Sequence, residues 1–197
     1  MLDVLYKNLI KYKEDLDNWF NKMYDENNLP FYGSVDVRYS GWKVSVVDAN
    51  YFPAGFNNLD IDFNTELAIH FKNYINSKYE GILHIHIFPE SHTRNVGYIE
   101  NILRLKKIGS LAGYSISVGS PLLNGFDLLE GHSDDLLLDK VIINRDGFLE
   151  IDGKVPDLIL LNNDLTGGLL PGLKGVVEPP VEMGWFERKK SNHYLIL

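Results

Sequence analysis

Apolar and polar residues follow two different periods along the chain, and these periods predict its elements. Near the N-terminus, apolar residues recur at alternating spacings of three and four, which predicts one amphipathic helix of about six turns. We expect it to end at Asn27, Asn28 and Pro30. Its apolar face comprises Leu2, Leu5, Leu9, Tyr12, Leu16, Trp19 and Met23. Without complementary flanking charges, this face favours a packed helix over a coiled coil.

A period of two follows the first helix. Residues 35–46 alternate between apolar and polar on either side of a break at 39–41, which predicts a hairpin. Asn64 or Thr65 is expected to cap a second helix that ends at Gly81. The apolar face of this helix is formed by Leu67, Phe71, Tyr74 and Ile75.

The middle of the chain predicts a parallel sheet. Residues 82–88 are an almost unbroken apolar run, typical of a central strand that is buried on both faces. A third helix is expected after Thr93, closing at Gly113, and residues 114–118 form the next predicted strand. The inward-facing residues of this helix are expected to be Ile99, Leu103 and Leu111. The strand–helix–strand order is a βαβ unit, which implies a parallel pair in an α/β sheet.

The last third of the chain combines short strands with a long loop. Strands are predicted at 136–143, 148–151 and 157–161. Asp146 and Gly147 supply a turn that would join the first two as a hairpin. Glycine and proline then crowd residues 165–184, which predicts a long surface loop.

Composition sets the class of protein. The 197 residues, 45% hydrophobic and 23% charged, favour a single α/β domain over the whole chain. We expect a mixed sheet with a parallel βαβ core, antiparallel hairpins and helices packed on it. The net charge of −8 argues against a nucleic-acid partner. No apolar run approaches the length of roughly 20 residues that spans a bilayer, and no basic amphipathic segment suggests a membrane surface.

Cysteine is absent, so disulfides, a thiol nucleophile and Cys-ligated zinc are excluded. The N-terminus also lacks the order of basic, apolar and small residues found in a secretory signal. We therefore expect a cytoplasmic protein.

Residues 48–58 follow a predicted strand and interleave aromatic residues with amides. Such a loop on a rigid scaffold is typical of a site for a small polar ligand. The alternative is a packed structural loop in which the amides satisfy its own backbone. The candidate ligand-binding residues here are Asn50, Asn57 and Asn58.

Residues 90–95 follow the central strand and open a helix, which is where ligands of parallel sheets gather. The free N–H groups of a helix start favour an anion, and Arg94 can hold a carboxylate or phosphate through two hydrogen bonds. The alternative is a helix capped by Thr93 with a solvated Arg94. The position favours binding, and the candidates are Glu90, His92, Arg94 and Asn95.

Two further polar segments are candidates. Asn163 and Asp164 follow another apolar strand, although they are also typical of a simple turn. Three polar segments at strand ends predict the rim of one pocket. The only basic cluster, at 185–191, includes Arg188 and could complement an anionic ligand, although a short basic run is usually a solvated face and Glu187 dilutes its charge.

His84 and His86 share one face of the central strand, and His92 follows it. A His-x-His metal site is one interpretation. The other, which we favour, is that histidines of an internal strand hydrogen-bond to their neighbours, so we assign no metal ligand. Neither a dinucleotide-binding nor a phosphate-binding glycine motif occurs in the chain.

Four motifs taken together resemble one family. They are the Phe-Pro-Ala-Gly-Phe-Asn-Asn run at 52–58, Pro-Glu-Ser-His-Thr-Arg-Asn at 89–95, Leu-Leu-Asn-Asn-Asp-Leu at 160–165, and Gly-Trp with Arg-Lys-Lys-Ser at 184–191. In this order they resemble the glutamate–cysteine ligase family of the proteobacterial type. The resemblance extends over essentially the whole chain, but only over the N-terminal half of the family's members.

The resemblance implies ATP-dependent formation of γ-glutamylcysteine from glutamate and cysteine, the first step toward glutathione. It implies that ATP and Mg²⁺ bind mainly to a second, ATP-grasp half that this chain lacks, and that the fold is similar to the N-terminal part of an ATP-grasp-type ligase. The chain is then expected to be inactive without an ATP-binding half, supplied by a second chain. The apolar end at 194–197 also suggests a covered surface or self-association.

On this resemblance, Arg38, Arg94 and Arg188 would bind carboxylate or phosphate groups, and Asp164 would pair with a substrate ammonium. The orienting groups would be Asn50, Asn57, Asn58, Asn163 and Asp164. Two other functions stay open. The first is a non-catalytic remnant or small-molecule-binding module of the same fold, and the second is a metal-dependent hydrolase that uses His84, His86 and His92.

Overall fold

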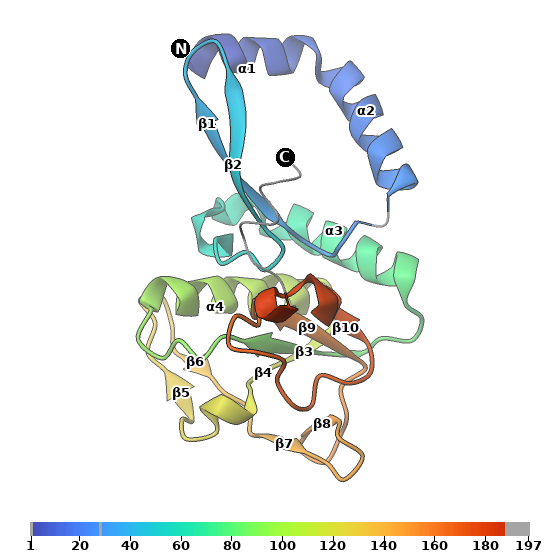
Figure 1. Ribbon diagram of the computed structural model, residues 1–197, viewed down its shortest axis with the longest axis vertical. Coiled ribbons are helices and arrows are strands. Elements are labelled where there is room, and N and C mark those ends of the chain that lie inside the picture. Colours follow the sequence, from blue (N-terminus) through green and yellow to red (C-terminus); the bar gives the residue numbers. More distant parts are fainter. Residues whose placement is uncertain (1, 28, 188–197) are drawn as a thin grey trace.

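The computed structural model describes residues 2–27 and 29–187, and its centre is a parallel sheet (Figure 1). The order of strands in this sheet is β10-β9-β3-β4, and all three neighbouring pairs are parallel. The strands are β3 (His84–Pro89), β4 (Ser115–Val118), β9 (Leu158–Asn162) and β10 (Val177–Glu178). The predicted parallel βαβ core is confirmed by β3, the helix α4 (Val96–Leu111) and β4.

Both predicted antiparallel hairpins are present, and a third hairpin, of β5 and β6, was not predicted. Among the described residues the three hairpins form separate two-stranded sheets rather than one mixed sheet, because none of their strands hydrogen-bonds to the parallel sheet. They pair β1 (Ser34–Tyr39) with β2 (Val44–Asn50), β5 (Leu128–Leu129) with β6 (Leu136–Leu137), and β7 (Val141–Ile143) with β8 (Leu149–Ile151). The strand predicted at 136–143 is thus two strands, since Leu138 and Asp139 turn aside to donate to the carbonyls of Asp127 and Val118.

Two helices cover one face of the parallel sheet (Figure 1). The first is α3 (Asn64–Lys78), and the second is α4. Their buried side chains, among them Phe71, Ile75, Ile99, Ile102, Leu105 and Ile108, pack against Ile85, Ile87, Leu158 and Leu160 of the sheet. Gly109 lets α4 approach β4, because a Cβ there would lie only 2.7 Å from Cδ1 of Ile116.

The ends of these helices differ from the predictions. Helix α3 begins at Asn64 without a side-chain cap from Asn64 or Thr65, because a 3₁₀ turn (Ile61–Phe63), capped by Asp60, leads directly into it. It ends at Lys78, before Gly81. Helix α4 begins at Val96 rather than just after Thr93, because Asn95 is its N-cap. Leu111 is 50% exposed, since its neighbour Ala112 takes the inward position.

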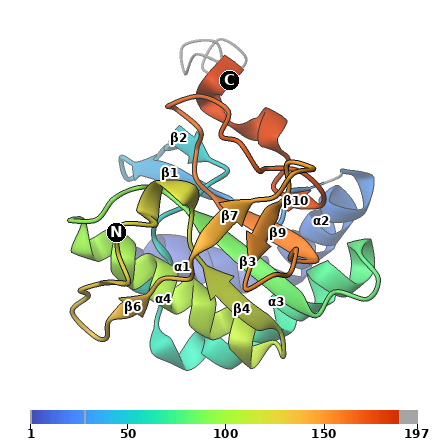
Figure 2. The ribbon, with the colours of Figure 1, turned by 90° about the horizontal axis from the view of Figure 1, so that it is seen from below.

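The opposite face of the sheet is covered by the β7–β8 hairpin and by the glycine- and proline-rich segment that follows β9. Figure 2 shows β7 in front of the sheet strands. Phe88, Ile159 and Leu161 of the sheet pack against Val141, Leu149, Ile151 and Leu165. Gly172 has a φ of +92°, and a Cβ there would lie 2.4 Å from Cδ2 of Leu149, so glycine is required at this position.

The N-terminal quarter of the chain projects away from this body (Figure 1). It comprises α1 (Leu2–Lys11), α2 (Lys13–Glu26) and the β1–β2 hairpin, which together we call the arm. The hairpin is confirmed, with Tyr39 paired to Val44 at its tip. The single long helix is wrong, because the φ of −106° and ψ of 19° at Tyr12 lie outside the helical region and separate α1 from α2.

The arm does not pack as predicted. Leu9, Tyr12 and Trp19, all on the apolar stripe, are exposed, and so are Val35 and Val37 of the hairpin. Within the described ranges, no helix is long and apolar enough to cross a membrane.

One buried carboxylate joins the segment between α2 and β1, which we call the foot of the arm, to the body. Glu178 of β10 is 2% exposed, and its Oε1 accepts hydrogen bonds from the backbone N–H of Phe31 and the hydroxyl of Tyr74, both at 2.8 Å. The hydroxyl of Tyr79 donates to Oε2 at 2.6 Å. Nearby, the Tyr32 hydroxyl donates to the carbonyl of Leu161 at 2.7 Å. We call the Glu178 contacts the anchor.

Candidate functional site

The carboxyl ends of β3 and β9 lie side by side, with Pro89 in register with Asn162. Ligands of parallel sheets collect at such an edge. The structure brings the three polar segments of the sequence to this edge and joins them by hydrogen bonds. Asn162 Nδ2 donates to the carbonyl of Pro53 at 3.0 Å, and Asn163 Nδ2 donates to the carbonyl of Pro89 at 3.2 Å.

Asn101 and Tyr98, which sequence reasoning missed, hold this edge together through Asn162. Asn101 Oδ1 accepts from the backbone N–H of Phe56 at 3.0 Å, and its Nδ2 donates to Oδ1 of Asn162 at 3.2 Å. The Tyr98 hydroxyl donates to the carbonyl of Asn162 at 2.7 Å. A signal was available, because Asn101 lies three residues after Tyr98 and four before Leu105, on the apolar stripe of its helix.

Glu90 and Asp164 form an acidic pair at this edge. Glu90 is half-buried, and its Oε1 accepts from the backbone N–H of Asp164 at 2.8 Å. The backbone N–H of Glu90 donates to the Tyr98 hydroxyl at 2.7 Å. Burial raises the pKa of Glu90, the hydrogen bond from Asp164 N–H opposes this rise, and the charge of the Asp164 carboxylate adds to it. Two carboxyl groups at one edge favour a cationic group nearby.

The adjoining segment offers the opposite charge. Ser91 to Val96 line an open hollow of about 590 Å³ at the start of α4. Arg94 is exposed there, and the positive end of the helix dipole lies beside it. The His92 ring meets the Tyr98 ring edge-on, with 5.5 Å between centroids. Asn95 is already engaged, since its Oδ1 accepts from the backbone N–H of Tyr98 at 3.2 Å. Arg94 thus provides a positive group four residues after Glu90, in the segment that joins β3 to α4.

The remaining predicted residues lie further from this pair or serve the backbone. Asn50 Oδ1 accepts from the Phe52 N–H at 2.8 Å, and Asn163 Oδ1 accepts from the Leu165 N–H at 2.9 Å. Asn57 and Asn58 are exposed on a 3₁₀ turn (Phe56–Asn58). Arg38 lies near the tip of the β1–β2 hairpin, away from the sheet edge.

Arg188, most of the predicted basic cluster and the apolar end at 194–197 lie outside the described residues. The binding roles of all these residues stay predictions.

The strand histidines are engaged in a hydrogen-bond chain. His86 Nε2 lies 2.9 Å from the carbonyl of Gly119, so it carries the proton and donates. His86 Nδ1 then accepts from the Ser117 hydroxyl at 2.8 Å, and that hydroxyl accepts from Nε2 of His84 at 2.7 Å. Burial lowers the pKa of His86 to about 4, which keeps the ring neutral. His92 lies beyond the other end of β3.

Over the described ranges, no group of three or more His, Cys, Asp or Glu side chains is placed to hold a metal ion. With both nitrogens of His86 already bonded, the metal-dependent hydrolase finds no support in this strand.

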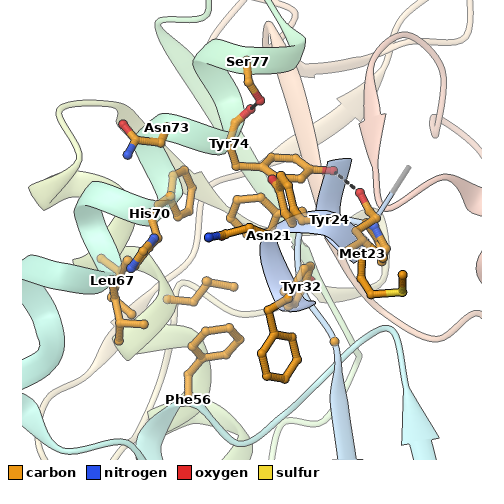
Figure 3. Close-up of a pocket in the computed structure, with 18 residues that line it drawn as sticks. Asn21, Met23, Tyr24, Tyr32, Phe56, Leu67, His70, Asn73, Tyr74 and Ser77 are labelled. Carbon is orange, nitrogen blue, oxygen red and sulfur yellow. Dashed lines mark hydrogen bonds between the residues drawn. The ribbon is translucent and has the colours of Figure 1, made fainter. Parts of the chain in front are cut away.

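A second hollow, larger than the one at the start of α4, lies elsewhere. It has a volume of about 780 Å³ and is found between α2 and α3. Figure 3 shows Leu67, His70 and Tyr74 of α3 facing it, together with Tyr32 and Phe56. Phe20, Met23 and Tyr24 line it from α2. Its wall is largely aromatic and aliphatic, so we call it the apolar hollow, and it lacks the paired charges of the sheet edge.

Comparison with known proteins gives a consistent result. The family model for glutamate–cysteine ligase matches residues 6–197. The chain is also similar to a crystal structure from Methylobacillus flagellatus KT, of a protein classed as a gamma-glutamylcysteine synthetase, at 36% identity and a TM-score of 0.83. The match covers 98% of this chain and 47% of the other, so this chain spans about half the length of that relative. No curated protein matches.

Proposed function

The chain belongs to the glutamate–cysteine ligase family, and on that premise we propose that it is the amino-acid-binding part of such a ligase, inactive until the remaining half of the enzyme joins it. The observation that carries the proposal is the arrangement at the carboxyl end of β3. The acidic pair at the end of β3 is followed directly in the chain by the segment that carries Arg94 and opens α4. An amino acid carries the complementary charges, an ammonium and a carboxylate.

The charges suggest which group binds which part of the substrate. Arg94 and the first N–H groups of α4 would hold a carboxylate, because a guanidinium and a helix N-terminus both favour an anion. Glu90 and Asp164 would hold the ammonium. Glutamate has two carboxylates, so one can bind at Arg94 while the other faces the ATP-binding half. The remaining predicted residues would orient the substrate from the rim.

ATP and Mg²⁺ do not fit the described residues. The chain has no glycine-rich phosphate loop ending in Lys-Ser or Lys-Thr, and the described part offers no cluster of three metal-binding side chains. We assign both to the remaining half of the ligase. When bound to that half, ATP would supply the phosphoryl group that activates the side-chain carboxylate of glutamate, and the cysteine amine would then displace phosphate to form the amide bond. This chain would contribute binding and orientation.

Calorimetry with three ligands tests the binding mode on the isolated chain. L-Glutamate carries all the charges, glutarate lacks the ammonium, and 4-aminobutyrate lacks the α-carboxylate. We expect Arg94→Gln to weaken glutamate and glutarate alike by at least tenfold, because each loses its partner for a carboxylate. Glu90→Gln should weaken glutamate but leave glutarate unchanged, since glutarate has no ammonium.

Arg145→Gln is the matched control, because Arg145 is an exposed arginine in the β7–β8 turn, remote from the site. Equal glutamate binding by wild type and Arg94→Gln would refute the proposed site. The alternative function is a non-catalytic binding module, which the missing phosphate loop favours. Adding the remaining half of the ligase with ATP and Mg²⁺ separates the two, because the binding module would form no γ-glutamylcysteine.

A further inference from the structure

The arm exposes many large apolar side chains. Trp42 is 85% exposed, Phe20 60% and Val37 53%. The other exposed apolar side chains of the arm include Val4, Tyr6, Leu9, Ile10, Tyr12, Trp19, Tyr24, Val35, Val44, Val46 and Val47. Single exposed apolar residues are ordinary, whereas a series along neighbouring elements marks an interaction surface.

The arm also lacks support of its own. A two-stranded hairpin is at best marginally stable in water, and β1 and β2 pair only with each other. The helices α1 and α2 are short for isolated helices, which are marginal below about 12–15 residues. Over the described residues of α1 and α2, the side-chain hydrogen bonds and ion pairs involve only α2 and its C-cap Asn27, as in Lys13 with Asp17 and Lys22 with Glu26. A partner that covers the arm would therefore stabilise it.

The apolar hollow continues this surface into the body. Phe20 and Tyr24 of α2 line it and are themselves exposed, while Phe71 and Ile108 at its floor belong to the buried core. Tyr32 and Phe56 stand in its wall, and both also contact the sheet edge through hydrogen bonds to Leu161 and Asn101. A segment that filled the hollow would therefore lie close to the candidate amino-acid site.

The length of the relative indicates which partner fits. The match covers 98% of this chain but only 47% of the relative. In the relative, the region that corresponds to this chain is therefore joined to an unmatched region of about the same length. A tethered segment acts at an effective concentration in the millimolar range, far above that of a second copy of the chain in solution. The net charge of −8 also makes two copies repel each other.

We propose that the arm and the apolar hollow form the docking surface for the remaining half of the ligase. The partner is an apolar face of that half, which inserts side chains into the hollow between α2 and α3. Docking there would place the ATP-binding half beside Tyr32 and Phe56, next to the edge that carries Glu90 and Arg94. The partner's identity rests on the proposed function, whereas the surface rests on the exposure of the arm.

Hydrogen exchange tests the surface with intact proteins. Backbone amides of β1 and β2 in this chain are compared with the matching amides in the full-length Methylobacillus flagellatus relative. We expect exchange in the relative to be at least a hundredfold slower, because the arm is covered there. The β7–β8 hairpin is the internal control and should exchange alike in both. Equal exchange of the arm in both proteins would overturn the proposal.

Complex formation tests the partner. The polypeptide that makes up the unmatched part of the relative is co-expressed with this chain, and co-purification is measured for three variants. Phe20→Asp and Trp42→Asp should weaken the complex at least tenfold, whereas Ile142→Asp, which alters an exposed apolar residue of β7, should not. All three residues are exposed, and circular dichroism checks that each variant is folded.

The outcomes separate the two proposals. A complex that depends on Phe20 but makes no γ-glutamylcysteine would refute the proposed function and keep the docking surface. Product formed equally by wild type and Phe20→Asp would refute the docking surface and keep the function. No complex at all, or an arm covered by a second copy in sedimentation experiments, would also refute the docking surface.

Discussion

The arm and the body are made from similar apolar patterns, yet only the body buries them. Ile85, Ile87 and Leu160 of the parallel sheet are at most 1% exposed, while Val37 on an equally regular hairpin is 53% exposed. The parallel strands have a layer on each face, whereas most residues of β1 and β2 are exposed. The difference shows that hydrophobic periodicity predicts an element and its apolar face, but not whether the partner of that face belongs to the same chain.

The largest contrast is expected from truncating one side chain in each region. Ile87→Ala should lower the free energy of unfolding by about 2–5 kcal/mol, because it opens a cavity between the sheet and α4. Chemical denaturation followed by circular dichroism measures this loss. A loss below 1 kcal/mol would mean that the body is as loosely packed as the arm.

The body should also respond to pH through one buried histidine. The pKa of His86 in the folded protein is about 4, below the value of 6.5 for an unperturbed histidine. Its contribution to stability is therefore complete above pH 6.5 and is lost as the pH falls from 6.5 through 4. This difference between the two pKa values corresponds to about 3 kcal/mol in the free energy of unfolding.

Thermal unfolding at several pH values measures the effect. His86→Gln should flatten the loss of stability between pH 6.5 and 4, whereas His70→Gln, at an exposed site, should leave it unchanged. An unaltered pH profile in His86→Gln would assign the acid sensitivity to other groups.

The anchor connects the two regions, so its loss should affect both. Glu178→Gln leaves one acceptor oxygen for three donors, from Phe31, Tyr74 and Tyr79. We expect a cost of about 1–3 kcal/mol, the usual range for a buried donor without a partner. Relative to wild type, Glu178→Gln should accelerate hydrogen exchange more at the foot of the arm than in β3. Glu130→Gln, at an exposed site, is the control, and equal exchange in both variants would mean that the anchor does not hold the arm.

The smallest effect is expected in the arm itself. Val37→Thr keeps the shape of the side chain and its preference for a strand, and removes apolar surface that is already exposed. The free energy of unfolding should change by no more than about 0.5 kcal/mol, as for most surface substitutions. A loss comparable with that of Ile87→Ala would show that the arm packs within the isolated chain after all.

The parallel core of the body was predicted correctly because each signal there is local. The run at 82–88 and the stripe of α3 depend only on period and apolar character, and both were predicted correctly. The helix starts were misplaced because capping depends on side-chain orientation, which put Asn95 rather than Thr93 at the start of α4. The arm was misjudged because nothing local shows that a face stays uncovered.

The candidate site was predicted in outline for a similar reason. Polar residues at strand ends located Glu90, Arg94 and Asp164, because parallel strands bring their carboxyl ends to one edge. Sequence spacing gave no indication that Asn101 and Tyr98 would tie the edge together through Asn162, since these contacts span more than 60 residues. Asn57 and Asn58 were expected at the rim. Their loop is instead held to the edge through its backbone, because the Phe56 N–H donates to Asn101 and the Pro53 carbonyl accepts from Asn162.

The anchor also has a consequence for how the protein is made. Phe31 and Glu178 are 147 residues apart in sequence, so the ribosome releases the foot of the arm long before it synthesises the carboxylate that fixes it. At about 5–20 residues per second, the interval is roughly 7–30 s. Throughout that time the nascent arm presents its aromatic side chains to the surrounding medium, which makes this segment a natural client for a chaperone during translation.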